Sequence, residues 1–212
     1  DMSLVKGALK YRHFVLGIIG VFVYMGIEVG TPTYVNMYLV NTPELGINAA
    51  TAGLIVAVYW ALMMVGRFVG ASIGSKVSSR AMITTVSSAT LVLVLFGMFA
   101  PTDVTVSVPG IDWANLSVIW AQVPVGIFAF LLVGLCSSVM WGGIFNMAVE
   151  GLGKYTAVAS GIFMTMVFGC AVMLAIQAQV AEMTDYMTSY WVVVFCAVYL
   201  LFYALVGSKV KK

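Results

Sequence analysis

Charge is scarce in this sequence of 212 residues: only 8% of the residues are Asp, Glu, Lys or Arg, whereas 62% are hydrophobic. Soluble domains contain about 25% charged residues. A soluble domain of this size could not bury so much apolar surface, because small domains leave much of their surface exposed. The composition therefore excludes the soluble, disordered, nucleic-acid-binding and disulfide-rich secreted classes, and it predicts an integral membrane protein.

Histidine and cysteine are also nearly absent. The single histidine, His13, excludes a histidine-based metal site or a catalytic triad. The three cysteines lie singly in apolar runs without CxxC spacing, and we expect small core residues at Cys136, Cys170 and Cys196. A Gly-x-Ser-x-Gly string at residues 70–74 lacks a strand-turn-helix context and is interpreted as a chance match. No enzyme activity, metal or cofactor is expected.

Long apolar runs are abundant instead. A membrane-spanning helix needs about 20 apolar residues, and polar or turn-forming segments separate six such runs. These runs, called spans 1 to 6 below, are residues 14–40, 50–73, 81–100, 120–149, 155–181 and 189–207. The one sizeable loop, residues 101–117, has a Thr/Val alternation that is compatible with a small hairpin.

The basic residues predict the orientation, because Lys and Arg stay on the cytoplasmic side. Nine of the ten lie before span 1, between spans 2 and 3, between spans 4 and 5, or after span 6. The opposite loops contain five acidic residues and no Lys or Arg. Both termini are therefore expected in the cytoplasm, with residues 1–13 as a linker segment, 14–207 as the transmembrane bundle and 208–212 as a basic tail.

Glycine is concentrated in spans 1, 2, 4 and 5. Because small residues allow close helix contact in lipid, we expect these four spans to pack together and spans 3 and 6 to face lipid. Gly30-Thr31-Pro32 interrupts span 1 and Gly142-Gly143 interrupts span 4. Paired interruptions in oppositely directed helices mark the binding helices of inverted-repeat transporters. The predicted fold is an all-α membrane protein with six transmembrane helices in a 3+3 inverted repeat.

Glu28 lies near the middle of span 1, where a carboxylate costs roughly 2.5–3.5 kcal/mol on insertion scales. Glu28, Pro32 and Asn36 recur every four residues, so they are expected on one helix face. This pattern indicates solute or ion binding. The alternative interpretation is a protonated glutamate that forms a hydrogen bond between helices.

Span 4 contains a second polar stripe, with Trp141 beside it. Tryptophan prefers membrane interfaces, so an indole at mid-depth is unusual. Its flat face suits the C–H face of a sugar ring and its N–H can donate to a hydroxyl, whereas the alternative is a tryptophan that only packs. The stripe consists of Ser138, Gly142, Asn146 and Glu150, and Tyr59 on span 2 is a candidate of lower rank.

Arg67 is the one cation away from the loops, about two turns inside the cytoplasmic end of span 2. Glu150 ends span 4 on the same side. An ion pair between them would lower the desolvation cost of both, and we predict that it closes a cytoplasmic gate; the alternative for Arg67 is snorkelling to the headgroups. The glycines at 66, 70 and 74 predict a tight packing face within the chain.

Several segments also resemble a known family, the fucose/galactose/glucose proton symporters of the major facilitator superfamily. Residues 22–30 and 34–39 resemble its seventh helix, and residues 66–70 with Lys76 and Arg80 its eighth helix and basic loop. Residues 135–145, 151–153 and 159–161 are similar to its tenth and eleventh helices. Two departures are present: Gly142-Gly143 replaces the usual Pro-Thr, and Gly74-Ser75 stands where the loop motif has an Asp.

The resemblance implies the C-terminal six-helix half of a twelve-helix transporter in the bacterial inner (plasma) membrane, with an N-terminal half as its partner. It also implies a sugar substrate (hexose or deoxyhexose), a coupling proton and alternating access. Since the chain opens with Asp1 rather than Met, the true N-terminus is expected elsewhere, with residues 1–12 resembling the end of the linker between halves.

By this resemblance Glu28, Asn36 and Trp141 would contact the sugar, and the proton-titrating carboxylates are expected in the other half. Further lining is expected from Tyr38, Tyr59, Ser138 and Asn146. Two other functions stay open: a six-helix channel or assembly subunit that acts alone or as a homodimer, and a superfamily carrier for lipid or drug.

Overall fold

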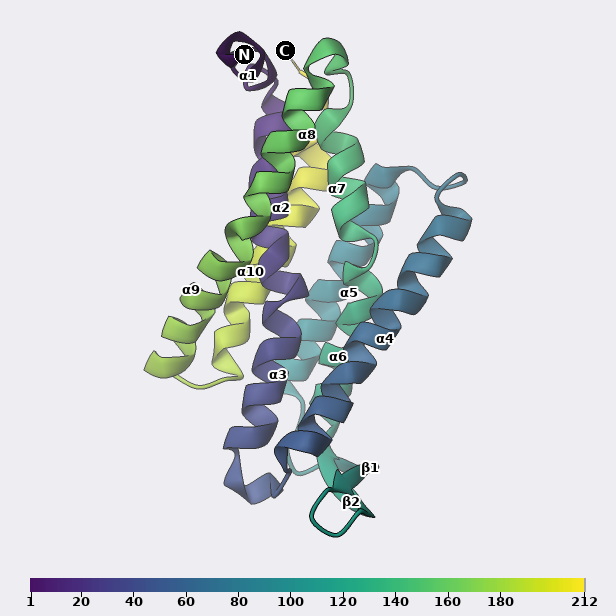
Figure 1. The fold of residues 1–212 in the computed structure, drawn as a ribbon, viewed down its shortest axis with the longest axis vertical. Coiled ribbons are helices and arrows are strands. Elements are labelled where there is room, and N and C mark those ends of the chain that lie inside the picture. Colours follow the sequence, from purple (N-terminus) through teal and green to yellow (C-terminus); the bar gives the residue numbers. More distant parts are fainter. Residues whose placement is uncertain (212) are drawn as a thin grey trace.

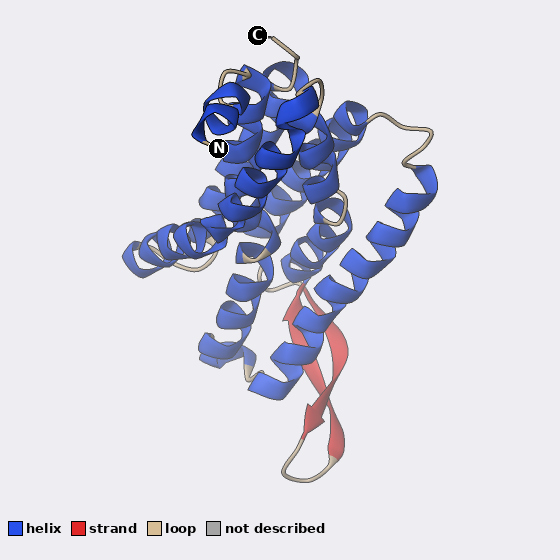
Figure 2. Ribbon diagram, turned by 45° about the horizontal axis from the view of Figure 1, so that its top comes forward, coloured by secondary structure: helices blue, strands red, loops and turns tan. Residues whose placement is uncertain are grey.

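The computed structural model describes residues 1–211, and it is helical apart from one hairpin (Figures 1 and 2). Among these residues, six segments are long and apolar enough to cross a membrane: Arg12–Asn41, Ala49–Ile73, Ser79–Phe99, Val125–Val149, Gly153–Met183 and Thr188–Gly207. They match the predicted spans within a few residues, so the chain is a multi-pass membrane protein. Lys212 of the predicted basic tail lies outside the described residues.

Three of the six spans are divided into shorter helices, and α1 (Met2–Ala8) precedes them. Span 1 contains α2 (Arg12–Glu28) and α3 (Gly30–Asn41), span 2 is α4 (Ala49–Ile73), and span 3 is α5 (Ser79–Phe99). Span 4 contains α6 (Val125–Ser137) and α7 (Met140–Val149), span 5 contains α8 (Thr156–Thr165) and α9 (Gly169–Met183), and span 6 is α10 (Trp191–Phe202), extended by a π-helical turn at Tyr203–Gly207. Short 3₁₀ turns occupy Pro43–Leu45, Gly153–Tyr155, Met166–Phe168 and Thr188–Tyr190.

Spans 1 and 4 form the centre of the bundle. Span 2 packs on span 4 through α4 and α6, and span 5 packs on span 1 through α9 and α2. Spans 3 and 6 contact each other and also pack on spans 4 and 1, respectively. The second and third helices of each triplet thus pack on the first helix of the other triplet, which is the arrangement expected of a 3+3 inverted repeat.

The prediction from glycine content is wrong for spans 5 and 6. In the hydropathy windows of the six spans, 56% of span 6 is buried against only 22% of span 5, and α4 and α9 lie on opposite sides of the central pair (Figure 1). The glycines permit one close approach each: a Cβ at Gly134 would strike the Tyr59 carbonyl, and one at Gly169 would strike the Phe22 carbonyl. A glycine therefore indicates a close contact with one neighbouring helix and not the burial of a whole span. Span 6 has almost no glycine and is buried through large side chains such as Tyr203.

Both predicted interruptions exist, but the second lies one turn earlier than expected. Span 1 breaks at Val29, directly after Glu28. Span 4 breaks at residues 138–139 rather than at Gly142-Gly143. The hydroxyl of Ser138 donates to the Leu135 carbonyl at 2.6 Å, and such local hydrogen bonds compete with the helical ladder. Gly143 serves packing instead, because an added Cβ would lie 2.5 Å from the Ile83 side chain.

The loop between spans 3 and 4 forms an antiparallel hairpin of β1 (Thr105–Asp112) and β2 (Ser117–Pro124). Strand β2 includes residues 120–124 of the predicted span 4, which therefore begins at Val125. The Asp112 carboxylate accepts hydrogen bonds from the Asn115 amide at 2.7 Å and the Ala114 N–H at 2.9 Å. The bond from Asn115 lowers the pKa of Asp112. The hairpin lies at the end of the bundle opposite both termini (Figure 1).

Candidate substrate-binding site

The break in span 1 places a carboxylate beside a guanidinium. Oε1 of Glu28 lies 3.6 Å from Nη2 of Arg67, with side chains that are 15% and 61% exposed, respectively. The predicted ion pair between Arg67 and Glu150 is therefore wrong. The prediction rested on the shared cytoplasmic side of Arg67 and Glu150, whereas packing decides the partner, because α4 lies along α3 and α6 while Glu150 lies beside Arg80.

A tyrosine ties this break to the break in span 4. The Tyr59 hydroxyl donates to the Glu28 carbonyl oxygen at 2.9 Å and lies 3.1 Å from Oγ of Ser137. Tyr24 donates to the Ser137 carbonyl at 3.3 Å. Tyr59 was predicted to line the site. Because its side chain is fully buried, it instead holds the backbone next to Glu28. Tyr24 and Ser137 are not among the predicted site residues, although Tyr24 stands one turn before Glu28 and Ser137 adjoins the polar stripe of span 4.

The Gly66 to Gly70 face fixes where Arg67 lies. A Cβ at Gly66 would strike the Ser138 side chain, and a Cβ at Gly70 would strike Val139, so α4 contacts span 4 directly at its break. This confirms the predicted packing face within the chain for these two glycines. Arg67, between them in sequence, lines a cleft of about 220 Å³.

This cleft contains part of the predicted polar stripe of span 4. Ser138, Gly142 and Asn146 line it together with Arg67, and the Asn146 amide donates to Oγ of Ser79 at 3.4 Å. The structure thus combines a cation, two hydroxyls and an amide around one opening. These groups can donate to and accept from a neutral polyhydroxylated ligand.

Trp141 lies in an aromatic cluster. Its ring stacks on Phe145 at 5.5 Å with an angle of 6° between the planes, and it meets Phe163 of α8 edge-on at 5.4 Å and 77°. Trp141 is half-buried, so part of its surface stays open. Asn36 and Tyr38 are half-buried residues of α3 that lie about 12 to 15 Å along the helix from Glu28, and the structure does not bring them to the ion pair.

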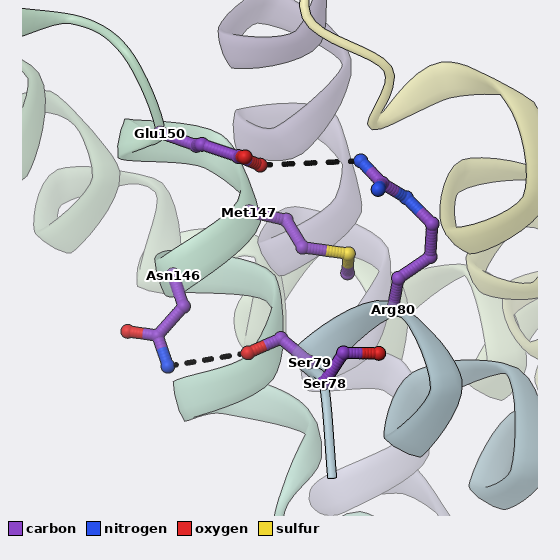
Figure 3. Close-up of a pocket in the computed structure, with 6 residues that line it drawn as sticks. All are labelled: Ser78, Ser79, Arg80, Asn146, Met147 and Glu150. Atoms are coloured by element: carbon purple, nitrogen blue, oxygen red, sulfur yellow. Dashed lines mark hydrogen bonds and ion pairs between the residues drawn. The ribbon is translucent and has the colours of Figure 1, made fainter. Parts of the chain in front are cut away.

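The end of the bundle that carries both termini has its own ion pair. Nη2 of Arg80 lies 3.9 Å from Oε2 of Glu150, and the guanidinium also donates to Oγ and the carbonyl of Ser208 at 3.0 and 3.1 Å. Nε2 of the buried His13 lies 2.7 Å from the Glu150 carbonyl. Arg80 and Glu150 border a polar cavity of about 250 Å³ (Figure 3). Helices α5, α7 and α2 and the end of span 6 are therefore joined at this end.

No protein-family model matches the chain. A glucose/galactose transporter of Brucella abortus is 30% identical over 202 residues, which are 95% of this chain and 44% of that protein. A Helicobacter pylori protein, provisionally given the same name, is 28% identical over 96% of this chain and 46% of its own length. The chain thus spans about half the length of the curated relatives that it matches.

Solved structures decide the fold. The fucose:proton symporter FucP of E. coli superimposes with a TM-score of 0.80 at 18% identity, over 96% of this chain and 45% of that one. A structure of the major facilitator superfamily transporter FucP in the outward conformation gives 0.75 at 19% identity, over 91% and 42%. The fold is one half of a major facilitator superfamily fold.

The resemblance drawn from the residues of spans 1, 2, 4 and 5 is confirmed in the fold, which is that of one major facilitator superfamily half, and in the relatives, which are named glucose/galactose transporters. Its relatives are named as transporters, which supports the expectation that the chain is not an enzyme. In this half-fold the broken spans 1 and 4 lie side by side at the centre, and the ion pair of Glu28 and Arg67 lies where both are interrupted.

Proposed function

We propose that this chain is the C-terminal half of a proton-coupled sugar transporter of the bacterial inner membrane, with both termini in the cytoplasm. A hexose or deoxyhexose would bind between this half and an N-terminal half, and the two halves would rock to expose it alternately to each side. The names of the relatives support sugar as the substrate class. The basic residues at the end that carries the termini support the orientation.

The observation that carries this proposal is the ion pair of Glu28 and Arg67 at the two helix breaks. A carboxylate and a guanidinium provide strong acceptors and donors for hydroxyl groups, and charge-assisted hydrogen bonds are the strong ones. Each charge lowers the cost of keeping the other in the membrane while the site is empty. Sugar hydroxyls would insert between the two groups.

The remaining lining residues take secondary roles. Trp141 would contact the apolar face of the ring, since an aromatic face suits C–H groups. Ser138 and Asn146 would form hydrogen bonds from the cleft beside Arg67. Asn36 and Tyr38 would act further along α3, on the path from the outer side. The coupling proton would titrate a carboxylate of the other half.

The cytoplasmic gate would be formed by Arg80 and Glu150 rather than by Arg67 and Glu150. Their ion pair joins the start of α5 to the end of α7 and borders the cavity of Figure 3. Opening toward the cytoplasm would move these two helix ends apart within this half. Both side chains are already 41% and 55% exposed, and an exposed ion pair contributes little, so the pair can break at small cost.

Uptake of radiolabelled hexose by the complete transporter in proteoliposomes, with and without an imposed proton gradient, tests the proposal. Uptake that is accelerated by an inward proton gradient and inhibited by free glucose or galactose is expected. Gradient-independent flux would contradict proton coupling. Binding that hexoses fail to displace would indicate a carrier for lipid or drug, and activity of purified material that contains only this chain would indicate a channel or homodimer.

A further inference from the structure

An apolar groove separates α4 from α5 on the outside of the bundle, toward the end that carries the termini. It encloses about 660 Å³ and is lined almost entirely by aliphatic side chains. Val65, Val69 and Ile73 follow one another along α4, and Thr85 and Val86 form the opposite wall on α5. The three α4 side chains are 40–53% exposed, so the groove is open to its surroundings. The polar cleft beside Arg67 adjoins this groove, and the two share Gly70, Val77, Met82 and Val139 as wall residues.

The depth of the groove matches one leaflet of a bilayer. Val65 and Ile73 are eight residues apart, which corresponds to about 12 Å along a helix. The hydrocarbon core of one leaflet is about 15 Å deep, half of the roughly 30 Å of a bilayer. The groove therefore runs from near the middle of the membrane to the loop between α4 and α5, as the acyl chain of a phospholipid in that leaflet does.

The mouth of the groove carries an uncompensated positive charge. Lys76 stands in the α4–α5 loop, directly before the lining residue Val77, and is exposed. Within residues 1–211, the ion pairs of the structure involve only Arg67 and Arg80, so Lys76 is free to meet an external anion. The N-terminus of α5, a helix of 21 residues capped by Ser78, lies next to it, and helix N-termini favour negative charge.

We propose that this groove is a binding site for an anionic phospholipid, with one acyl chain between α4 and α5 and the phosphate at Lys76. All three features favour the same orientation of the lipid. The apolar walls and the depth of one leaflet suit an acyl chain along the groove, and the basic mouth places the headgroup at the loop between α4 and α5. The floor of the groove includes Gly70 and Val139, which form the contact of α4 with the break in span 4. A bound acyl chain would therefore support the seam that positions Arg67.

Native mass spectrometry of the purified protein with mixed phosphatidylglycerol and phosphatidylcholine tests the site without measuring transport. The wild type should retain one phosphatidylglycerol in preference to phosphatidylcholine. Val69→Trp should fill the groove and abolish retention. Lys76→Gln should still bind a lipid but lose about fivefold in headgroup preference, the effect of one basic residue near an anionic membrane surface.

Two matched variants control for general effects. Val92→Trp adds the same bulk at an exposed position of α5 outside the groove, where Val92 is 68% exposed against 53% for Val69. Lys211→Gln removes one positive charge at the same end of the bundle. Both variants should behave as wild type. If Val69→Trp does not fold, Val65→Phe at the deep end replaces it. Equal retention of the two lipids by wild type, or undiminished retention in the filled groove, would overturn the site whatever the substrate of the transporter.

Discussion

The guanidinium of Arg67 lies 3.6 Å from the carboxylate of Glu28, although the two residues belong to different spans. Each is a charge that the hydrocarbon disfavours, and each makes the other tolerable. The pair lies at the break of span 1, where Tyr59 also donates to the Glu28 carbonyl. One structural contact therefore compensates the least favourable residues of the chain and forms the proposed binding site.

Glu28→Gln should lower kcat/KM for hexose uptake by at least about tenfold, which corresponds to about 1.4 kcal/mol. The change removes the charged acceptor and leaves Arg67 without its partner. Removal of both charges, in Glu28→Gln with Arg67→Gln, should restore expression lost in either single variant but not uptake. Uptake by proteoliposomes, normalised to protein amount, checks this, and normal kinetics in Glu28→Gln would refute the site.

Trp141→Ala should raise the KM for sugar several-fold, because the aromatic face is lost, whereas Trp141→Phe should retain most of the affinity. Trp113→Ala provides the control, since Trp113 is 65% exposed on the hairpin at the opposite end from the termini. Equilibrium binding of labelled hexose to the purified transporter measures the effect. An identical loss in Trp141→Phe and Trp113→Ala would point to general destabilisation.

Tyr59→Phe should destabilise the protein by about 1 kcal/mol, the net value of a typical buried hydrogen bond. It leaves the Glu28 carbonyl and Ser137 without the hydroxyl between them. Thermal unfolding in detergent measures the change, with Tyr155→Phe as the control, because Tyr155 is only half-buried. A Tyr59→Phe protein as stable as the wild type would mean that the hydroxyl does not tie the two breaks together.

Gly134→Ala should destabilise the bundle by about 1–3 kcal/mol, since the new methyl group would overpack the contact with α4. An added Cβ there meets the Tyr59 carbonyl, whereas one at Gly142 meets nothing within 4 Å. Gly142→Ala should therefore be neutral or stabilising by up to about 1 kcal/mol, as alanine is the better helix former. The same thermal unfolding assay compares the two, and the reverse order of stability would contradict the packing of α4 on α6.

Arg80→Gln should favour the state that is open at the end carrying the termini. Labelling of a cysteine introduced at Asn146, in the cavity that Arg80 also lines, should become several-fold faster with a membrane-impermeant maleimide. Lys154→Gln removes a charge at the same end without touching this ion pair and is the control. Unchanged labelling in Arg80→Gln would exclude Arg80 and Glu150 as the gate.

The sequence by itself determined the class of the protein, its six spans and the presence of breaks in spans 1 and 4, but neither the position of the break in span 4 nor the division of span 5. The class, the spans and the presence of breaks follow from local quantities: 62% hydrophobic residues, runs of about 20 apolar residues, and Gly and Pro within them. It also identified Glu28 and Arg67 as residues that require compensation, because a charge in hydrocarbon is costly wherever it lies.

Only the tertiary structure decided which residues meet. Arg67 pairs with Glu28 rather than Glu150, because the glycines of α4 bring that helix against the break of span 4. Tyr59 is a buried support rather than a lining residue, and spans 2 and 5 lie on opposite sides of the centre. Partner choice depends on the approach of helices that are distant in sequence, and spacing along one helix does not contain that information.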